Sequence, residues 1–359
     1  MFVLPATLPW QERVIQSIEK LEEGIEESRR DLLIVGKVLD KAVHEDKIHI
    51  KARQVRFSWQ RGVKIGQGNF GKVYTAINNE TGDIMAMKEI PLQPNDHRTL
   101  KSVSDELKIF ESIHHPHLVK HFGIEIHREE MLIFMEYCPE GTLETLVSST
   151  EFGLEEVLGR RYTRQLTQAI SCLHENGVVH RDIKTANIFL TEEMKTVKLG
   201  DFGCAVKIKA ATTMPGELQG FVGTQAYMAP EVFTRNMSEG HGRAADIWSL
   251  GCVVLEMIQG ERPWANIHSN YQIMYKVGMG QSPEVPDELS EEGKNFLECC
   301  FVHSPEERAT AQDLLSHNFT KVFDEDENNP SIPLFTSVAE GSDWKKSLGR
   351  RDSGKFSAT

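Results

Sequence analysis

Two motifs near the middle of the chain constrain its fold more strongly than its composition does. The first is His180-Arg181-Asp182-Ile183-Lys184-Thr185-Ala186-Asn187, and the second is Asp201-Phe202-Gly203. Phosphoryl transfer needs a carboxylate near the incoming hydroxyl, oxygen ligands for two Mg²⁺ ions and cations against the phosphate charge. Asp182, Asn187, Asp201 and Lys184 are side chains of these types. The motifs therefore indicate a phosphoryl-transfer site, and they favour a fold that brings both of them to it.

A glycine-rich run lies upstream, at Gly66-Gln67-Gly68-Asn69-Phe70-Gly71-Lys72-Val73. Its G-x-G-x-x-G spacing is a weak signal alone, because dinucleotide-binding loops share it. Such a loop would open a helix, whereas Val73-Tyr74-Thr75 continues as strand-forming sequence. We therefore expect a hairpin flap whose backbone amides approach phosphate oxygens closely. In that flap Val73 would press on a base, and Phe70 would shield the phosphates from water.

Lys88 follows an apolar run, Met85-Ala86-Met87, on a predicted strand. From there its ammonium group could reach the α and β phosphates of a nucleotide. Glu106 is the candidate partner, because it shares a helical stripe with Ile109, Phe110 and Ile113 that would face the core. In isolation, either residue would be interpreted as an ordinary surface charge.

Charge and composition argue against several classes of partner. The 359 residues carry 40 Lys and Arg against 53 Asp and Glu, a net charge of −13, which offers no general attraction to nucleic acid or anionic membranes. The best apolar run, near residues 250–258, contains Glu256 and is shorter than the roughly 18 residues of a membrane span. Six scattered cysteines without a C-x-x-C pair indicate reduced thiols, and no secretory leader is apparent. We expect a cytoplasmic protein with no nucleic-acid or membrane partner.

Hydrophobic periodicity divides the chain into four parts. Short alternating runs in residues 57–137 predict five strands (about 62–67, 73–77, 84–90, 118–126 and 131–136) and one helix (about 100–113). Residues 138–322 are mainly helical in pattern (about 143–147, 154–176, 244–259, 270–277, 290–300 and 311–315). The tail, 323–359, has the composition of a disordered segment.

Residues 1–55 form the remaining part, with a predicted helix from about 11 to 43. Its seam has heptad-like spacing (Val14, Ile18, Leu21, Ile25, Leu32, Val35 and Leu39). This helix could pair with a second copy, contact an upstream activator or pack on its own chain, and the spacing leaves these alternatives open.

The ordered set of motifs, completed by Ala229-Pro230-Glu231 and Asp246-Ile247-Trp248-Ser249-Leu250-Gly251, resembles the eukaryotic protein kinase family over about residues 57–322. The runs 223–231, 242–252 and 201–204 are similar to the MAP kinase kinase kinases of the MEK-kinase type. The resemblance implies an α+β bilobal fold: a small lobe with a five-stranded antiparallel sheet and one major helix (57–137), and a larger helical lobe (138–322). It also implies ATP and Mg²⁺ between the lobes and MAP kinase kinases as substrates. The alternative is a nucleotide-binding pseudokinase or scaffold, although no residue needed for the chemistry is missing.

The same resemblance implies a role for each residue that matches a family motif. The ATP-binding residues would be Ile65, Gly66, Gly68, Asn69, Phe70, Gly71, Val73, Ala86, Lys88, Met135, Glu136, Cys138 and Phe189. The catalytic residues would be Asp182, Lys184, Lys88, Glu106 and Thr224, and the Mg²⁺ ligands would be Asn187 and Asp201. Lys184 and Thr224 favour serine or threonine acceptors. Activation would involve phosphorylation of Thr213, or of Thr212, and Arg181 would bind the added phosphate.

Two structural contacts and one aromatic stack are also implied by the resemblance. Glu231 would pair with a buried Arg308, and Asp246 would accept hydrogen bonds from the backbone at His180 and Arg181. The stack would contain His180, Phe202, Phe110 and His121.

Overall fold

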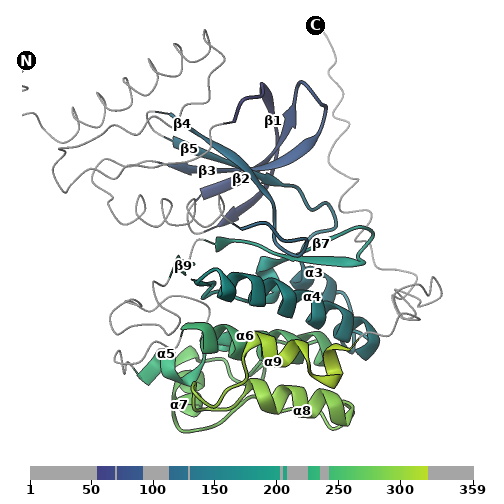
Figure 1. Ribbon diagram of the computed structural model, residues 1–359, viewed down its shortest axis with the longest axis vertical. Helices are drawn as coiled ribbons and strands as arrows, with labels where there is room; N and C mark the ends of the chain where they lie inside the picture. Colours follow the sequence, from purple (N-terminus) through teal and green to yellow (C-terminus); the bar gives the residue numbers. More distant parts are fainter. Residues whose placement is uncertain are drawn as a thin grey trace, which may run out of the picture.

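The computed structural model describes residues 55–68, 71–91, 113–127, 130–202, 205–207, 225–234 and 242–321. A five-stranded sheet lies at one end of this part of the chain, and a mainly helical region lies at the other (Figure 1). The predicted helix at 11–43, nearly all of the one at 100–113 and the tail from 323 onward fall outside the described residues.

The sheet contains β1 (Trp59–Gly68), β2 (Gly71–Asn78), β3 (Ile84–Pro91), β4 (His121–Ile126) and β5 (Glu130–Glu136). Its order is β1-β2-β3-β5-β4, and every neighbouring pair is antiparallel. All five predicted strands are therefore present. The strand expected from residue 118 begins instead at His121. The preceding segment bonds with Leu199 of the helical lobe, because the Val119 N–H donates to the Leu199 carbonyl and the Leu199 N–H donates to the His117 carbonyl.

One face of the sheet is covered by the segment that leads into it. Met87 and Phe134 are fully buried on this face, and Phe57 and Trp59 meet the Phe134 ring edge-on at centroid distances of 5.9 and 5.1 Å. The indole N–H of Trp59 donates a hydrogen bond of 3.0 Å to Glu125. The residues before β1 therefore complete the apolar layer of the small lobe.

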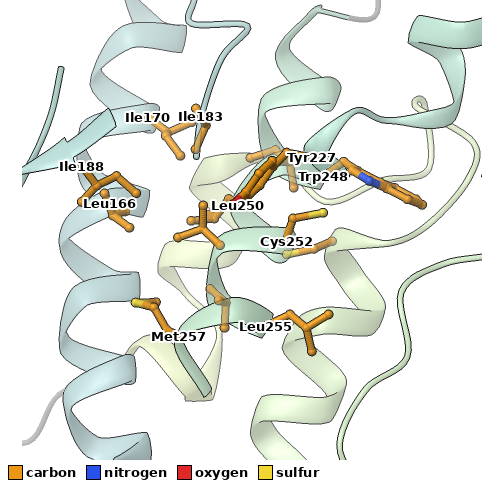
Figure 2. Packing of buried hydrophobic residues seen from close by; sticks show 14 of the residues in the cluster. Leu166, Ile170, Ile183, Ile188, Tyr227, Trp248, Leu250, Cys252, Leu255 and Met257 are labelled. Atoms are coloured by element: carbon orange, nitrogen blue, oxygen red, sulfur yellow. The ribbon is translucent and has the colours of Figure 1, made fainter. Parts of the chain in front are cut away.

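The helical lobe is built around one buried helix. Its helices are α3 (Leu143–Ser148), α4 (Glu156–Glu175), α5 (Pro230–Thr234), α6 (Gly242–Gln259), α7 (Asn270–Gly278), α8 (Glu291–Cys300) and α9 (Ala311–Leu315). Figure 2 shows Leu250 and Met257 of α6 on the side that faces α4, which carries Leu166 and Ile170, while Trp248 points away from α4. A helix that is apolar on nearly all sides belongs inside a core, and α6 occupies that position.

Short strands were not predicted in this lobe, yet two pairs are present. β7 (Ile188–Thr191) pairs with β8 (Thr196–Leu199), and β6 (Val178–Val179) pairs with β9 (Val206–Lys207). They contain only two to four residues each, too few for a periodic pattern to appear. Figure 1 shows β7 between the sheet and the helices.

Three 3₁₀ turns complete the described elements: η1 (Thr185–Asn187), η3 (Gln225–Tyr227) and η4 (Asn318–Thr320). Among the helices of the described part, none combines the length and apolarity needed to cross a membrane.

Candidate active site

Asp182 lies at the centre of a group of polar side chains in the loop between β6 and η1. The ammonium group of Lys184 lies 2.7 Å from Asp182 Oδ2, and the amide nitrogen of Asn187 donates to the same oxygen at 3.0 Å. Asn187 also donates to the main-chain carbonyl of Asp182 at 2.8 Å. The buried side chain of Ile183 anchors the loop from below. Lys184 and Asn187, which sequence analysis assigned to the same site as Asp182, therefore converge on the Asp182 carboxylate.

The loop is held from beneath by Asp246 of α6. The buried carboxylate of Asp246 accepts hydrogen bonds from the backbone N–H groups of His180 (2.9 Å) and Arg181 (2.8 Å), which confirms the expected contact. His174 lies 2.9 Å from the same carboxylate. Arg181 has φ = 70°, a conformation that costs free energy for a residue with a side chain. The Asp246 bonds help to hold the backbone in this shape.

His180 connects this loop to the second motif. It is fully buried, and burial lowers its pKa, which favours the neutral imidazole. Nδ1 accepts from the Asp182 N–H at 3.3 Å, so Nε2 carries the proton and donates to the Gly200 carbonyl at 3.1 Å. The His180 ring also stacks at 5.0 Å from Phe202, as expected. The imidazole therefore connects the backbone at Asp182 to the segment that begins at Gly200.

Asp201 links the helical lobe to the sheet. Lys88 is 7% exposed on β3, and its ammonium group lies 3.0 Å from Asp201 Oδ1. Asp201 has φ = 57°, and the neighbouring Gly200 N–H donates to the Asn187 carbonyl at 2.9 Å. The side chains of Lys88, Asp201, Asn187 and Asp182 thus belong to one connected site, although they come from different parts of the chain.

The predicted nucleotide-binding residues occupy neighbouring positions on the strands. Val73 is opposite Lys88 in the β2–β3 register, and Ala86 is opposite Met135 in the β3–β5 register. Alternation along a strand places Ala86 and Lys88 on the same face of the sheet. Ile65 and Gly66 lie on β1, with Gly66 opposite Val73, while Phe189 lies on β7.

Gly71 has a packing reason to be a glycine in addition to the predicted one. An added Cβ at this position would collide with the main-chain carbonyl oxygen of Glu89 on β3. At Gly66 the nearest atom to an added Cβ would be Val73 Cβ, at 3.9 Å. The two glycines therefore face different constraints, and a side chain at Gly71 would separate β2 from β3.

The end of β5 is tied to the helical lobe through Glu136. Its carboxylate contacts Lys198 of β8 at 2.8 Å and accepts from the Lys120 N–H at 3.1 Å. Nearby, burial raises the pKa of Cys138 to about 12, so its thiol stays protonated at neutral pH. Sequence analysis assigned Glu136 to ATP binding but did not identify Lys198 as its partner.

A buried polar cluster next to the loop that carries Asp182 was also missed. Glu256, 5% exposed on α6, accepts hydrogen bonds from Tyr227 (2.6 Å) and Thr185 (3.1 Å). Burial raises the pKa of the Glu256 carboxyl. The cluster connects η3 to the loop of Asp182. Its one signal in the sequence is a glutamate inside the most apolar run of the chain.

A buried ion pair between Arg308 and Glu231 stabilises the helical lobe farther along the chain. The guanidinium of Arg308 contacts both carboxylate oxygens of Glu231, at 2.7 and 2.9 Å, and Arg308 is 4% exposed. The pair implied by the sequence resemblance is therefore present, and its bidentate geometry is that of a strong interaction.

Several predicted site residues lie outside the part of the chain that the structure describes. They are Asn69, Phe70, Glu106, Phe110, Thr212, Thr213 and Thr224. Their assigned roles remain predictions.

Comparison with known proteins agrees with this geometry. The family model described as "Protein kinase domain" matches residues 59–320. The chain is 56% identical over 318 residues to human mitogen-activated protein kinase kinase kinase 4, covering 88% of this chain and 20% of that protein, and 57% identical to the mouse protein. It is 37% identical over 338 residues to the MAP kinase kinase kinase SSK2 of Saccharomyces cerevisiae, covering 84% of this chain and 21% of that protein. The chain thus spans about a fifth of the length of these relatives. The family-model match over residues 59–320, together with the arrangement around Asp182, shows that the chain belongs to the protein kinase family.

Proposed function

We propose that this chain transfers the γ-phosphate of ATP to serine or threonine hydroxyls of a protein substrate. The observation that carries the proposal is the convergence of Lys184 and Asn187 on Asp182 Oδ2, beside the Lys88–Asp201 contact. Asp182 would accept the proton of the acceptor hydroxyl as its oxygen bonds to the γ-phosphorus. The bond from that phosphorus to the β–γ bridging oxygen breaks, and ADP leaves with the electron pair. Lys88 and Lys184 would oppose the phosphate charge.

The side chains at the site fit Mg²⁺, a cation that prefers oxygen ligands. Asn187 uses its amide nitrogen as a double donor to Asp182, so its side-chain oxygen is the atom that would meet a cation. Asp201 offers a carboxylate close by. Bound Mg²⁺ would neutralise charge on the transferring phosphates. The resemblance also assigns the flap residues and Val73, Ala86, Met135, Glu136, Cys138 and Phe189 to ATP binding.

The acceptor class follows from Lys184 and from the relatives. A lysine two residues after Asp182 is typical of serine/threonine-directed members of the family, and Thr224 supports the same choice. Relatives of this chain are named as mitogen-activated protein kinase kinase kinases. We therefore infer that the substrates are MAP kinase kinases, that the chain acts in a MAP kinase cascade, and that it does so in the cytoplasm.

The decisive test is transfer by the purified 359-residue chain to a panel of intact, inactivated MAP kinase kinases. With Mg²⁺ and ATP, mass spectrometry should detect phosphate on serine or threonine. Asp182→Asn should keep ATP binding and lower the rate by about 10²- to 10⁴-fold, because an amide cannot accept the proton. Lys88→Met should inactivate as well, by misplacing the phosphates.

Asp287→Asn provides a matched control, because Asp287 is exposed in the helical lobe. It should retain wild-type turnover. If Asp182→Asn and Lys88→Met also retained it, the assignment would fail. If the wild type bound ATP but transferred nothing, the pseudokinase alternative would replace it.

A further inference from the structure

The turn between β7 and β8 contains three consecutive residues with a left-handed backbone. Glu192, Glu193 and Met194 have φ values of 57°, 58° and 65°. Glycine, asparagine and aspartate adopt this conformation most readily, and none of them occurs in the turn. Other residues keep such a backbone only where the surrounding structure holds them in it. The turn therefore depends on contacts from outside its own sequence.

The carboxylate of Glu140 makes such a contact. Its Oε1 accepts a hydrogen bond from the Glu193 N–H at 3.1 Å, and its Oε2 accepts one from the Met194 N–H at 3.3 Å. Hydrogen bonds to an ionised acceptor are stronger than those between neutral groups. Tyr162 of α4 adds a bond from its hydroxyl to the Met194 carbonyl. One carboxylate thus binds two successive N–H groups of a turn that lies 53 residues farther along the chain.

The segment that carries Glu140 contacts β7 at two further points. The Leu190 N–H donates to the Gly141 carbonyl at 2.9 Å, and Thr142 forms an antiparallel bridge with Phe189. Residues 142, 141 and 140 therefore contact residue 189, residue 190 and the turn in that order. Glu140 is the last member of this antiparallel series, and it is the one that contacts the turn.

Phe189 is the residue of β7 that these contacts bring to the candidate active site. Ile188 and Leu190 are buried in the core of the helical lobe, so alternation along the strand turns Phe189 to the opposite side. An added Cβ at Gly200, the residue before Asp201, would lie 3.0 Å from the Phe189 ring. Phe189 therefore packs beside the backbone that carries Asp201, and its position depends on where β7 is held.

We propose that Glu140 is a positioning residue for the base-binding part of the ATP site. Its carboxylate holds the β7–β8 turn against the segment that follows β5. This contact fixes Phe189 relative to Glu136 and Cys138, which are also assigned to ATP binding. The inference rests on the proposed protein kinase function and extends it. Glu140 would act through Phe189 and would not contact the nucleotide.

The test compares nucleotide binding by the full chain and by Glu140→Ala. Without the carboxylate the turn should relax and Phe189 should shift, so calorimetric titration should show about fivefold weaker binding of ADP with Mg²⁺. Adenosine should lose affinity by the same factor, because Phe189 would contact the base and not the phosphates. In transfer assays KM for ATP should rise likewise, while kcat should stay near the wild-type value.

Rescue by glycine distinguishes this role from a general effect on stability or charge. Glycine adopts a left-handed backbone without a steric cost, so Glu193→Gly/Met194→Gly should let the turn keep its shape without Glu140. Adding these two substitutions to Glu140→Ala should restore affinity for ADP and adenosine. The two glycines in the wild-type chain should leave both affinities nearly unchanged. Urea unfolding of each variant checks that the protein is folded in the assay.

Glu151→Ala is the matched control, because it removes the same charge from an exposed position in the loop between α3 and α4. It should bind both ligands as the wild type does. Unchanged affinity of folded Glu140→Ala for ADP and adenosine would overturn the proposal. A loss for ADP alone would overturn it too, since the carboxylate would then act on the phosphates. A loss that the two glycines leave in place would also overturn it, because the shape of the turn would not be the cause.

The proposed function and the role of Glu140 can fail separately. If the wild type bound ADP but transferred no phosphate, the pseudokinase alternative would replace the kinase proposal, and the affinities would still decide the role of Glu140. If the wild type transferred phosphate and Glu140→Ala bound ADP and adenosine normally, only the role of Glu140 would be refuted.

Discussion

Arg308 shows how a single buried charge is stabilised in this protein. Besides the two bonds to Glu231, its guanidinium donates to the carbonyls of Ala244 and Val302 and lies 5.2 Å from the ring centre of Trp248. Each of these contacts replaces water that the buried cation has lost. Removing one member of such a pair strands the other charge and typically costs about 3–5 kcal/mol. The pair therefore fixes the position of α5 relative to the segment between α8 and α9.

At the same scale, His121 predicts a pH dependence of stability. Burial lowers the pKa of this imidazole to about 4, below the ordinary value of 6.5. The folded state therefore favours the neutral ring. The resulting stabilisation is complete above pH 6.5 and is lost as the pH falls toward 4.

Between pH 7 and pH 5, the wild type should lose about 2 kcal/mol more unfolding free energy than His121→Gln. Urea unfolding at the two pH values measures the difference. The exposed His268 provides the control, because His268→Gln should follow the wild type. Parallel pH curves for wild type and His121→Gln would contradict the prediction.

Among the elements, α6 contributes most directly to the geometry of the active site. It is apolar along most of its length but carries two buried carboxylates, Asp246 and Glu256. Asp246 binds the loop at His180 and Arg181, whereas Glu256 binds it at Thr185 and also holds Tyr227 of η3. One buried helix therefore contacts the loop that carries Asp182, the η1 turn that follows it, and η3.

Asp246→Asn tests this role. An amide has one acceptor oxygen, so either the His180 or the Arg181 N–H would lose its partner, at a cost of about 1–3 kcal/mol. We expect kcat to fall at least tenfold with KM for ATP nearly unchanged, because the loop that holds Asp182 would shift while the sheet face would not. Steady-state kinetics and urea unfolding measure the two effects, with Asp287→Asn as the control. An unchanged kcat would refute a positioning role for Asp246.

The activation segment between Asp201 and Glu231 supports a separate prediction from sequence. Thr212 and Thr213 lie in it, and a phosphate there adds about −1.5 to −2 charge units that could order the segment against Arg181. Thr212→Ala/Thr213→Ala should therefore prevent activation by phosphorylation, as judged by transfer after preincubation with ATP. Full activity of this variant, with no phosphate at these threonines in the active wild type, would exclude the mechanism.

At the scale of the whole molecule, the two lobes meet through a few specific contacts. Lys88 reaches Asp201, Glu136 reaches Lys198, and Leu118 bridges to Leu199. These contacts lie at or near the β7–β8 hairpin, which places the hairpin at the junction of the lobes (Figure 1).

Deletion of residues 1–50 tests whether the predicted N-terminal helix takes part in the chemistry. No residue assigned to phosphoryl transfer lies in this segment. Transfer by enzyme that is already phosphorylated should therefore be nearly unchanged. Under the self-association alternative, Leu21→Glu/Leu32→Glu in the full chain should slow self-activation at low concentration and leave only monomer in sedimentation. A large loss of transfer in the deleted protein would contradict the prediction.

Local motifs were sufficient to predict the chemistry and the overall fold class. Asp182, Lys184, Asn187 and Asp201 could be found because their types and order are written in short continuous segments, and a period of two was enough for the five strands. Glu231–Arg308 and the Asp246 contacts were implied by the family resemblance. These features depend on nearby residues or on a pattern shared by the family.

Contacts between distant segments required the tertiary structure. Glu136 and Lys198 are 62 residues apart, and neither shows its partner in its local pattern. The departure of Leu118 from β4, the two-residue strands β6 and β9, and the Glu256 cluster likewise depend on which surfaces meet after folding. Helix α7 is the clearest case, because the exposed Tyr271 and Tyr275 have the same helical spacing as the buried Ile273 and Val277. Periodicity defines the two faces of a helix, but only its packing decides which face is buried and which faces solvent.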